Sequence, residues 1–437
     1  MLVMKFGGSS VKDAEMILKV ASLIQARIDK RPIVVLSAVK GTTDALLKAA
    51  EEVKTEVWES YDWIVAHHRS ILTSLKISDD TIAQELAELR EALDVISRSK
   101  DTSAKMLDYL VFFGERLSVA IMAAYLTKEG TSAQPYLSGD LGMITDSQFG
   151  NARLLEESEE KLKKNITALT HIPIITGFGG KDEQGEFTTF ARGGSDYVAA
   201  IIGAAIDAEE IQIWTDVNGV MTADPRFVEK TQTIPLLSFD EATQLAYFGA
   251  KVLHPKTIWP AIKKNIPVAV LNTYNPTHGG TKIVQSVEKP NTITAVTHKE
   301  GILVVNVKSL RMLDGHGYLA KIFEVFGRYR KAVDMLATSE VDVSMTVDSE
   351  ENLDEIVAEL SQFARVSVCR PNSIIQVVGE GLIETPGMAA RIFSTVGEEG
   401  INVEMISQCF NQISVGFLVK EKDARKAVAL LHKKFIE

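Results

Sequence analysis

The first candidate for chemistry in this sequence is a lysine beside two glycines, where a predicted strand is followed by a helix. Residues 5–10 are Lys-Phe-Gly-Gly-Ser-Ser, and an apolar strand is predicted from Leu2 to Phe6. Glycines let backbone N–H groups approach an anion closely, and a helix N-terminus favours negative charge. A plain strand-to-helix turn would use the same glycines. Lys5 beside them favours a phosphate site.

A second glycine turn precedes another predicted helix. Residues 188–196 are Thr-Thr-Phe-Ala-Arg-Gly-Gly-Ser-Asp, and the helix begins near Tyr197. Arg192 is suited to a bidentate grip on a carboxylate or a phosphate. Asp196 could hold a magnesium ion or a cationic side chain, and capping of the helix is the simpler alternative.

Two further segments carry charged residues that could bind a ligand. A predicted strand ends at Thr215-Asp216, and nucleotide clefts of open α/β sheets lie just past strand C-termini. Arg226 and Lys251 could meet phosphates there, although either alone could be a solvated surface charge. Glu115 stands in an otherwise apolar neighbourhood. It could be paired within the environment of Arg116, or it could receive a substrate ammonium.

The sequence lacks the common alternatives for phosphate chemistry. The one Gly-Lys pair, Gly180-Lys181, is followed by Asp182, which excludes a Walker A loop. Neither a His-Arg-Asp loop nor an Asp-Phe-Gly segment is present, so a protein-kinase site is excluded. The 8 histidines have no metal-ligand spacing, and the 2 cysteines support neither a disulfide framework nor a zinc site.

Composition narrows the class of protein further. The 437 residues exceed one ordinary core, so two or three domains are expected. With 47 Lys and Arg against 58 Asp and Glu, the formal charge of −11 disfavours nucleic acid and anionic membranes. The first residues have no basic segment followed by an apolar one, and no apolar run approaches ~18 residues. We therefore expect a soluble, cytoplasmic protein.

The predicted elements alternate in the manner of a parallel α/β sheet. The Leu2–Phe6 strand, a helix from about Asp13 to Asp29 and a strand at 33–36 form the first unit of this pattern. A small polar loop at 37–43 follows, and residues 44–128 are mostly helical, which suggests a helical insertion or lid. Strand patterns return at 172–177, 211–214 and 268–271, and residues 286–291 are the best linker candidate.

An internal repeat lies beyond this linker. Residues 317–327 match residues 387–397 in pattern, and later matching pairs keep the same separation of 70 residues. Each copy is predicted as a strand, a glycine loop, an amphipathic helix and two strands. A duplicated small βα module explains this regularity.

In order and combination, these segments resemble the aspartate kinases of the amino-acid kinase family, with two ACT modules at the C-terminus. The resemblance covers nearly the whole chain and rests on residues 5–10, 114–118, 192–196, 215–220 and 248–255. It implies an α/β amino-acid kinase three-layer sandwich around a mainly parallel sheet, plus two ferredoxin-like ACT domains. The implied domains are residues 1–286, 298–370 and 371–437.

The resemblance also implies that ATP and Mg²⁺ are the cofactors, and no protein ligand is assigned to the metal, which ATP would carry. It further implies roles for individual residues. Lys5, Asp196 and Lys251 would be catalytic. Aspartate would contact Thr43, Glu115, Phe178, Arg192 and Ser195. ATP would contact Lys5, Gly7, Gly8, Ser9, Thr215, Asp216, Arg226, Lys251 and Val252.

The first ACT module resembles the effector loop of lysine-sensitive relatives. The implied lysine-binding residues are Met312, Asp314, Gly315, Val333, Asp334, Thr338, Ser339 and Glu340. Acidic Asp334 favours L-lysine, although threonine, or both amino acids, remain alternatives within the family. ACT modules also imply a homodimer or a higher homo-oligomer. A kinase for glutamate or acetylglutamate, and an amino-acid sensor with an inactive kinase half, are the competing hypotheses.

Overall fold

The computed structural model describes residues 1–191, 193–249, 253, 255–287, 293–313, 316–382, 385–408 and 413–437. Five residues with predicted roles therefore lie outside the described residues, namely Arg192, Lys251, Val252, Asp314 and Gly315. Most of the predicted linker also lies outside them. The chain forms two compact units. The first comprises Met1–Val220, Pro235–Phe239 and Val252–Ser286, and the second comprises Met221–Ile234, Asp240–Lys251 and Val287–Glu437.

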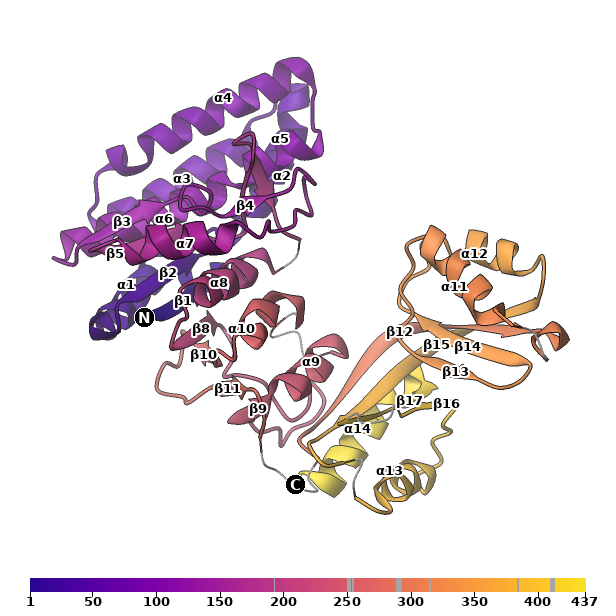
Figure 1. Cartoon of the computed structure of the whole chain (residues 1–437). Coiled ribbons are helices and arrows are strands. Elements are labelled where there is room, and N and C mark those ends of the chain that lie inside the picture. Colours follow the sequence, from indigo (N-terminus) through magenta and orange to yellow (C-terminus); the bar gives the residue numbers. More distant parts are fainter. Residues whose placement is uncertain are drawn as a thin grey trace. The chain divides into compact units, whose positions relative to one another are not determined.

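The first unit is built on a mainly parallel sheet (Figure 1). Its strand order is β3 (Ala133–Tyr136), β5 (Ile172–Thr176), β2 (Pro32–Leu36), β1 (Leu2–Phe6), β8 (Glu210–Thr215), β10 (Val268–Asn272), β11 (Thr281–Val284) and β9 (Leu236–Ser238). All pairings from β3 to β10 are parallel, and β11 runs antiparallel to β10. The predicted α/β class is confirmed.

The central strand β1 places Lys5 at one edge of this sheet. All five residues of β1 are buried, as expected of a parallel strand covered on both faces. Lys5 lies beside Val35 of β2 and Ile213 of β8, near the carboxyl end of each strand. The loops that follow β1, β2 and β8 therefore leave the sheet at one edge, where α/β proteins bind ligands.

The predicted helical region packs as part of the core. Its helices are α2 (Thr42–Glu52), α3 (Glu59–Leu75), α4 (Ala83–Ser99), α5 (Ala104–Val111) and α6 (Phe113–Lys128). Helix α6 packs against β3 and β5, and its Leu117 and Ile121 are fully buried. The suggestion of a lid is thus not supported for α6, because its apolar residues cover the sheet.

Among the described residues, one stretch is long and apolar enough, by length and composition alone, to cross a membrane. It spans Ala104–Lys128, which includes α5 and α6, and 78% of its most apolar window is buried inside the protein. A core helix meets the same criteria of length and composition. Burial against the sheet explains the apolar character here.

The described part of the first unit contains four further α-helices and a small second sheet. They are α1 (Ala14–Gln25), α7 (Ser158–Thr167), α8 (Gly194–Ala205), α10 (Trp259–Lys263) and a small sheet of β4 (Ile144–Thr145), β6 (Gly179–Asp182) and β7 (Phe187–Thr189). Helix α8 packs against β1. Helix α9 (Phe239–Tyr247) begins at the last residue of a first-unit segment and continues into the second unit.

The second unit contains a six-stranded antiparallel sheet. Its order is β13 (Leu336–Thr338), β14 (Asp342–Val347), β12 (Ala295–Lys308), β15 (Arg365–Val378), β17 (Ser414–Lys420) and β16 (Met405–Ser407). Its helices are α11 (Tyr318–Arg328), α12 (Leu353–Leu360), α13 (Met388–Gly397) and α14 (Glu421–Phe435). Helices α11 and α13 begin 70 residues apart, each after a left-handed glycine, Gly317 (φ 76°) or Gly387 (φ 79°), which confirms the repeat.

The two long central strands are each shared between the two copies. Residues 295–299 of β12 pair with the end of β15, whereas residues 302–308 pair with its beginning. The implied boundary between residues 370 and 371 therefore falls within β15. Two segments that the sequence assigns to the first domain, 221–234 and 240–251, cluster with the second unit.

Candidate functional site

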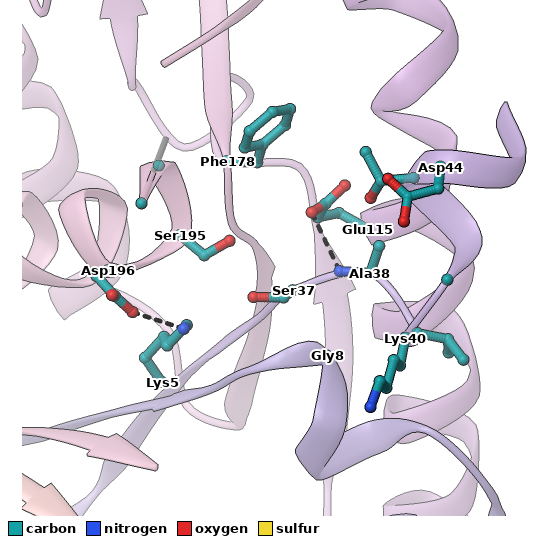
Figure 2. Close-up of a pocket in the computed structure, with 15 residues that line it drawn as sticks. Lys5, Gly8, Ser37, Ala38, Lys40, Asp44, Glu115, Phe178, Ser195 and Asp196 are labelled. Carbon is teal, nitrogen blue, oxygen red and sulfur yellow. Dashed lines mark hydrogen bonds and ion pairs between the residues drawn. The ribbon is translucent and has the colours of Figure 1, made fainter. Parts of the chain in front are cut away.

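A pocket of about 320 Å³ opens at the carboxyl edge of the first unit's sheet (Figure 2). Segments from five parts of this unit meet there: the end of β1, the loop after β2 with the start of α2, helix α6, the loop after β5, and the start of α8. The lining residues predicted from the sequence are Lys5, Gly8, Thr43, Glu115, Phe178, Ser195 and Asp196. The fold thus brings together residues up to 191 positions apart.

Lys5 and Asp196 form an ion pair in this pocket. The distance from Lys5 Nζ to Asp196 Oδ1 is 2.5 Å, and both side chains are largely buried. Figure 2 shows the two side chains pointing toward one another. The N-cap of α8 is Gly193, and no side chain caps this helix end. Asp196 is therefore the ion-pair partner of Lys5 and not the cap of this helix, and a role at a magnesium ion stays a prediction from the sequence.

The glycine turn after β1 is held close to the loop after β2. A Cβ atom on Gly8 would lie 2.7 Å from the carbonyl oxygen of Ala38, so only glycine fits this approach. The backbone N–H of Lys40 donates to the carbonyl of Gly8 at 3.3 Å, and that of Gly7 donates to the carbonyl of Trp214 at 3.2 Å. The N–H of Gly7 therefore already has a partner, whereas Gly8 faces the pocket.

Glu115 is a buried carboxylate with one oxygen available for a ligand. Only 3% of the residue is exposed, and its Oε1 accepts a hydrogen bond from the N–H of Ala38 at 3.1 Å. Its buried Oε2 has no hydrogen-bond partner among the described residues. Burial raises the pKa of Glu115 to about 8, opposed by the Ala38 hydrogen bond and by the charge of Lys5.

The neighbouring Arg116 is not the partner of Glu115. Arg116, the neighbour in sequence, points elsewhere and forms an ion pair with Glu88 at 2.6 Å. Glu115 is thus not paired with Arg116. A buried acid with an unpaired oxygen in a pocket is a typical site for a cationic group of a ligand.

Phe178 and Ser195 meet where the loop after β5 packs against α8. Phe178 has a φ of 71°, which is rare for a bulky residue, and its carbonyl accepts a hydrogen bond from the N–H of Phe190 at 2.8 Å. A Cβ atom on Gly177 would lie 2.6 Å from the side chain of Ser195. This tight packing fixes both lining residues in position, and strained backbone of this kind often occurs at ligand sites.

Several lining residues were not predicted. They are Ser37, Ala38, Val39, Lys40, Gly41, Asp44, Gly193 and Gly194. A signal for the first five was present in the sequence, because the polar loop at 37–43 directly follows a strand of the predicted parallel sheet. Loops at the same edge of a parallel sheet converge.

The predicted nucleotide residues fall in both units. Thr215 ends β8 beside β1, and its hydroxyl donates to the carboxylate of Asp216 at 3.2 Å. Neither residue lines the pocket described above. Arg226 belongs to the second unit, where its guanidinium pairs with Asp224 at 2.5 Å and is otherwise exposed.

The predicted effector residues lie in the second unit. Val333 and Asp334 precede β13, whereas Thr338 ends β13 and Ser339 and Glu340 form the turn into β14. Met312 ends a short 3₁₀ helix, Leu310–Met312. The carboxylate of Asp334 already has partners: Lys299 Nζ lies 3.2 Å away, and the hydroxyl of Tyr247 donates to it at 2.7 Å.

Comparison with known proteins agrees with the geometry. The sequence profile of the amino acid kinase family matches residues 1–272, and an ACT domain profile matches residues 375–435. Aspartokinase 3, chloroplastic, of Arabidopsis thaliana is 38% identical over 456 residues, covering 100% of this chain and 81% of the plant protein.

Two solved structures of Escherichia coli aspartokinase III have a similar fold over 100% of both chains. The complex with aspartate and ADP, described as the R-state, gives a TM-score of 0.85 at 32% identity. The complex with lysine and aspartate, described as the T-state, gives a TM-score of 0.82 at 31% identity. With the family profile and these full-length relatives, the chain belongs to the amino acid kinase family and, within it, to the aspartokinases.

Proposed function

We propose that this protein transfers the γ-phosphoryl group of ATP to the β-carboxylate of L-aspartate, giving 4-phospho-L-aspartate and ADP. This is the first step towards lysine and diaminopimelate, threonine and methionine. The observation that carries the proposal is one pocket containing both a largely buried lysine, Lys5, and a buried acid with an unpaired oxygen, Glu115. The lysine suits a phosphoryl group, and the acid suits an ammonium.

The chemistry requires no general base. The nucleophile is a substrate carboxylate, which is already ionised at neutral pH. Catalysis then depends on positioning and on stabilisation of charge on the transferring phosphoryl group. Lys5 would supply that charge from the end of a rigid, buried strand. Asp196 would hold the lysine in place until ATP arrives.

The acceptor would be recognised mainly by its charges. Its ammonium would bind Glu115, and its α-carboxylate would bind Arg192, with Thr43, Phe178 and Ser195 completing the site. N-acetylglutamate carries no ammonium and would leave the buried Glu115 without a partner, which disfavours an acetylglutamate kinase. The ion pair between Lys5 and Asp196 is the arrangement expected of a working kinase half, which disfavours an inactive scaffold.

The nucleotide would lie beside the glycine turn. Within the first unit, the proposed contacts are Gly7, Gly8, Ser9, Thr215, Asp216 and Val252. The resemblance also implies contacts from Arg226 and Lys251. Among the described residues there is no group of three His, Cys, Asp or Glu side chains that could hold a metal. We infer that Mg²⁺ would arrive with the ATP phosphates, whose charge it would neutralise.

The experiment that tests this proposal is hydroxylamine trapping of the product. An acyl phosphate reacts with hydroxylamine to give a hydroxamate, whereas phosphate esters and ADP do not. The hydroxamate formed with each candidate amino acid identifies both the acceptor and the type of bond made.

We further propose a homodimer, or a larger homo-oligomer, assembled through the second unit. Leu336 on β13 and Ile406 on β16 occupy equivalent repeat positions at the two ends of the strand order, and they are 37% and 49% exposed. Exposed apolar side chains on edge strands favour association with another chain. The cytoplasmic location remains a prediction from the sequence.

We also propose that L-lysine inhibits the enzyme by binding near Asp334. In the structure, the side chain of Asp334 is only 2% exposed and is neutralised by the chain's own ammonium on Lys299. Lys299 has an alternative partner in Asp348, at 3.1 Å. An effector ammonium would therefore compete with Lys299 for Asp334. The coupling requires lysine to bind the two states of the enzyme unequally.

Replacement of Lys299 by methionine tests this competition. We expect the half-inhibitory lysine concentration to fall about tenfold, because the buried carboxylate would lose its charged internal partner, keep only the Tyr247 hydroxyl, and favour an external ammonium. The matched control is Lys308→Met, on the same strand, where the lysine pairs with the more exposed Asp342. An unchanged or higher lysine requirement in K299M alone would show that Lys299 does not compete with the effector.

A further inference from the structure

The C-terminal end of β10 contacts two chain segments that are proposed to hold ATP, the glycine turn after β1 and the loop after β8. Three consecutive residues, Asn272, Thr273 and Tyr274, follow each other at the carboxyl edge of the sheet, within the first unit. Neither the sequence analysis nor the pocket assigned them a role. Their hydrogen bonds connect the glycine turn after β1 to the loop after β8.

The glycine turn is bound by two of these side chains. The hydroxyls of Ser10 and Thr273 lie 2.8 Å apart, and both residues are fully buried. The hydroxyl of Tyr274 donates to the carbonyl of Ser9 at 2.9 Å. Ser9 belongs to the proposed phosphate cradle, so these two bonds restrain the cradle from the side of β10.

The end of β8 and the loop after it are bound by two of these residues, Asn272 and Thr273. The backbone N–H of Thr273 donates to the carbonyl of Thr215 at 2.9 Å. The side-chain NH₂ group of Asn272 donates to the side-chain oxygen of Asn218 at 2.7 Å. The side-chain oxygen of Asn272 accepts a hydrogen bond from the backbone N–H of Tyr274 at 2.8 Å. The hydrogen bonds of Asn272, Thr273 and Tyr274 therefore connect the glycine turn to the β8 loop without a break.

We propose that Thr273 and Tyr274 are positioning residues for the nucleotide. They set the separation between the glycine turn and the β8 loop, and this separation fixes where the phosphates lie relative to Lys5. The inference rests on the proposed function, because it assumes that both segments contact ATP. Neither residue lines the pocket proposed for the acceptor. Their loss should therefore weaken nucleotide binding more than aspartate binding.

The simplest test removes one oxygen atom. Tyr274→Phe keeps the ring but deletes the hydroxyl that binds Ser9. We expect the ATP KM to rise about fivefold, the effect of losing one typical hydrogen bond, while the aspartate KM stays within about twofold. The matched control is Tyr136→Phe on edge strand β3, where the hydroxyl pairs with His171 at 2.8 Å. Neither KM should change in the control.

A second pair of variants separates positioning from simple stabilisation. Thr273→Ser keeps the hydroxyl that meets Ser10, whereas Thr273→Val removes it at nearly constant volume. T273S should retain the wild-type ATP KM, and T273V should raise it. Equal changes in both KM values, or a lower thermal midpoint with unchanged ATP KM, would overturn the positioning role.

Calorimetric titration with ADP distinguishes a failure of this inference from a failure of the proposed function. If the wild type binds ADP but phosphorylates another acceptor, the expected loss of ADP affinity in Y274F and T273V still tests the positioning role. Wild-type ADP affinity in both variants would contradict it, whatever the acceptor is.

Discussion

Lys5→Met is expected to lower kcat by about 10²- to 10³-fold, with a much smaller rise in the aspartate KM. The loss is of the size found when one preorganised donor to a developing charge is removed. Lys5 reaches the pocket from a strand whose five residues are all buried. Its ammonium would interact most strongly with the phosphoryl group in the transition state, so the rate rather than the binding should change.

Steady-state kinetics with both substrates varied measures this effect. Lys30→Met is a matched control in the same unit, because Lys30 is exposed and pairs with Glu209 only at 3.7 Å. Asp196→Asn should lower kcat in the same direction but less, since it loosens Lys5 without removing it. If K5M instead raised the aspartate KM at an unchanged kcat, Lys5 would be an acceptor-binding residue.

Glu115→Gln is expected to raise the aspartate KM by about 100-fold or more. The glutamine has nearly the same shape but no charge, so the substrate ammonium would be buried without its counter-ion. In the wild type, the aspartate KM should fall as the pH rises towards about 8, because the free enzyme must lose the Glu115 proton to form the pair. This pH dependence should disappear in the variant.

The same substitution should increase thermal stability. The pKa of Glu115 rises from an ordinary value of 4.5 to about 8 on folding, so its protonated form favours the folded state. That contribution is fully present below pH 4.5 and is lost as the pH rises through about 8. A glutamine stays neutral at every pH and does not lose this stabilisation. The Tm of E115Q should therefore exceed that of the wild type by an amount that grows from pH 5.5 to pH 8.5 and reaches about 2–4 °C.

Glu91→Gln is the control for this comparison, since Glu91 is an exposed carboxylate in the same unit. Its Tm relative to wild type should not depend on pH in this range. A Tm for E115Q that is below that of wild type at pH 8.5 would show that the Glu115 carboxylate stabilises the fold. The assignment of this residue to the substrate would then lose its physical basis.

Much of the site was predictable because its residues are few and the sheet is parallel. Lys5, Glu115 and Asp196 stand out in the sequence as charges beside glycine turns or among apolar residues, and the fold places all three in one pocket. In the polar loop at 37–43, the resemblance assigned only Thr43, and the other lining residues could not be assigned without the loop's neighbours in the sheet. Strand order, which sequence periodicity does not determine, places this loop beside β1.

Other features depended on contacts between distant segments. The sequence shows Asp334 as an acid in the effector loop. It does not show that the Asp334 carboxylate is already paired with Lys299 and hydrogen-bonded by Tyr247. The hydrogen bonds of Thr273 and Tyr274 to the glycine turn join residues more than 260 positions apart. A repeat detected at a fixed spacing also did not reveal that β12 and β15 each serve both copies of the ACT module.

Trapping of the acyl phosphate formed from L-aspartate and ATP tests the central claim most directly. With Mg²⁺, ATP and hydroxylamine, the wild-type protein should form aspartyl hydroxamate, and ADP should appear in equal amount. Glutamate and N-acetylglutamate should give little hydroxamate under the same conditions. Hydroxamate formation from glutamate but not from aspartate would contradict the account.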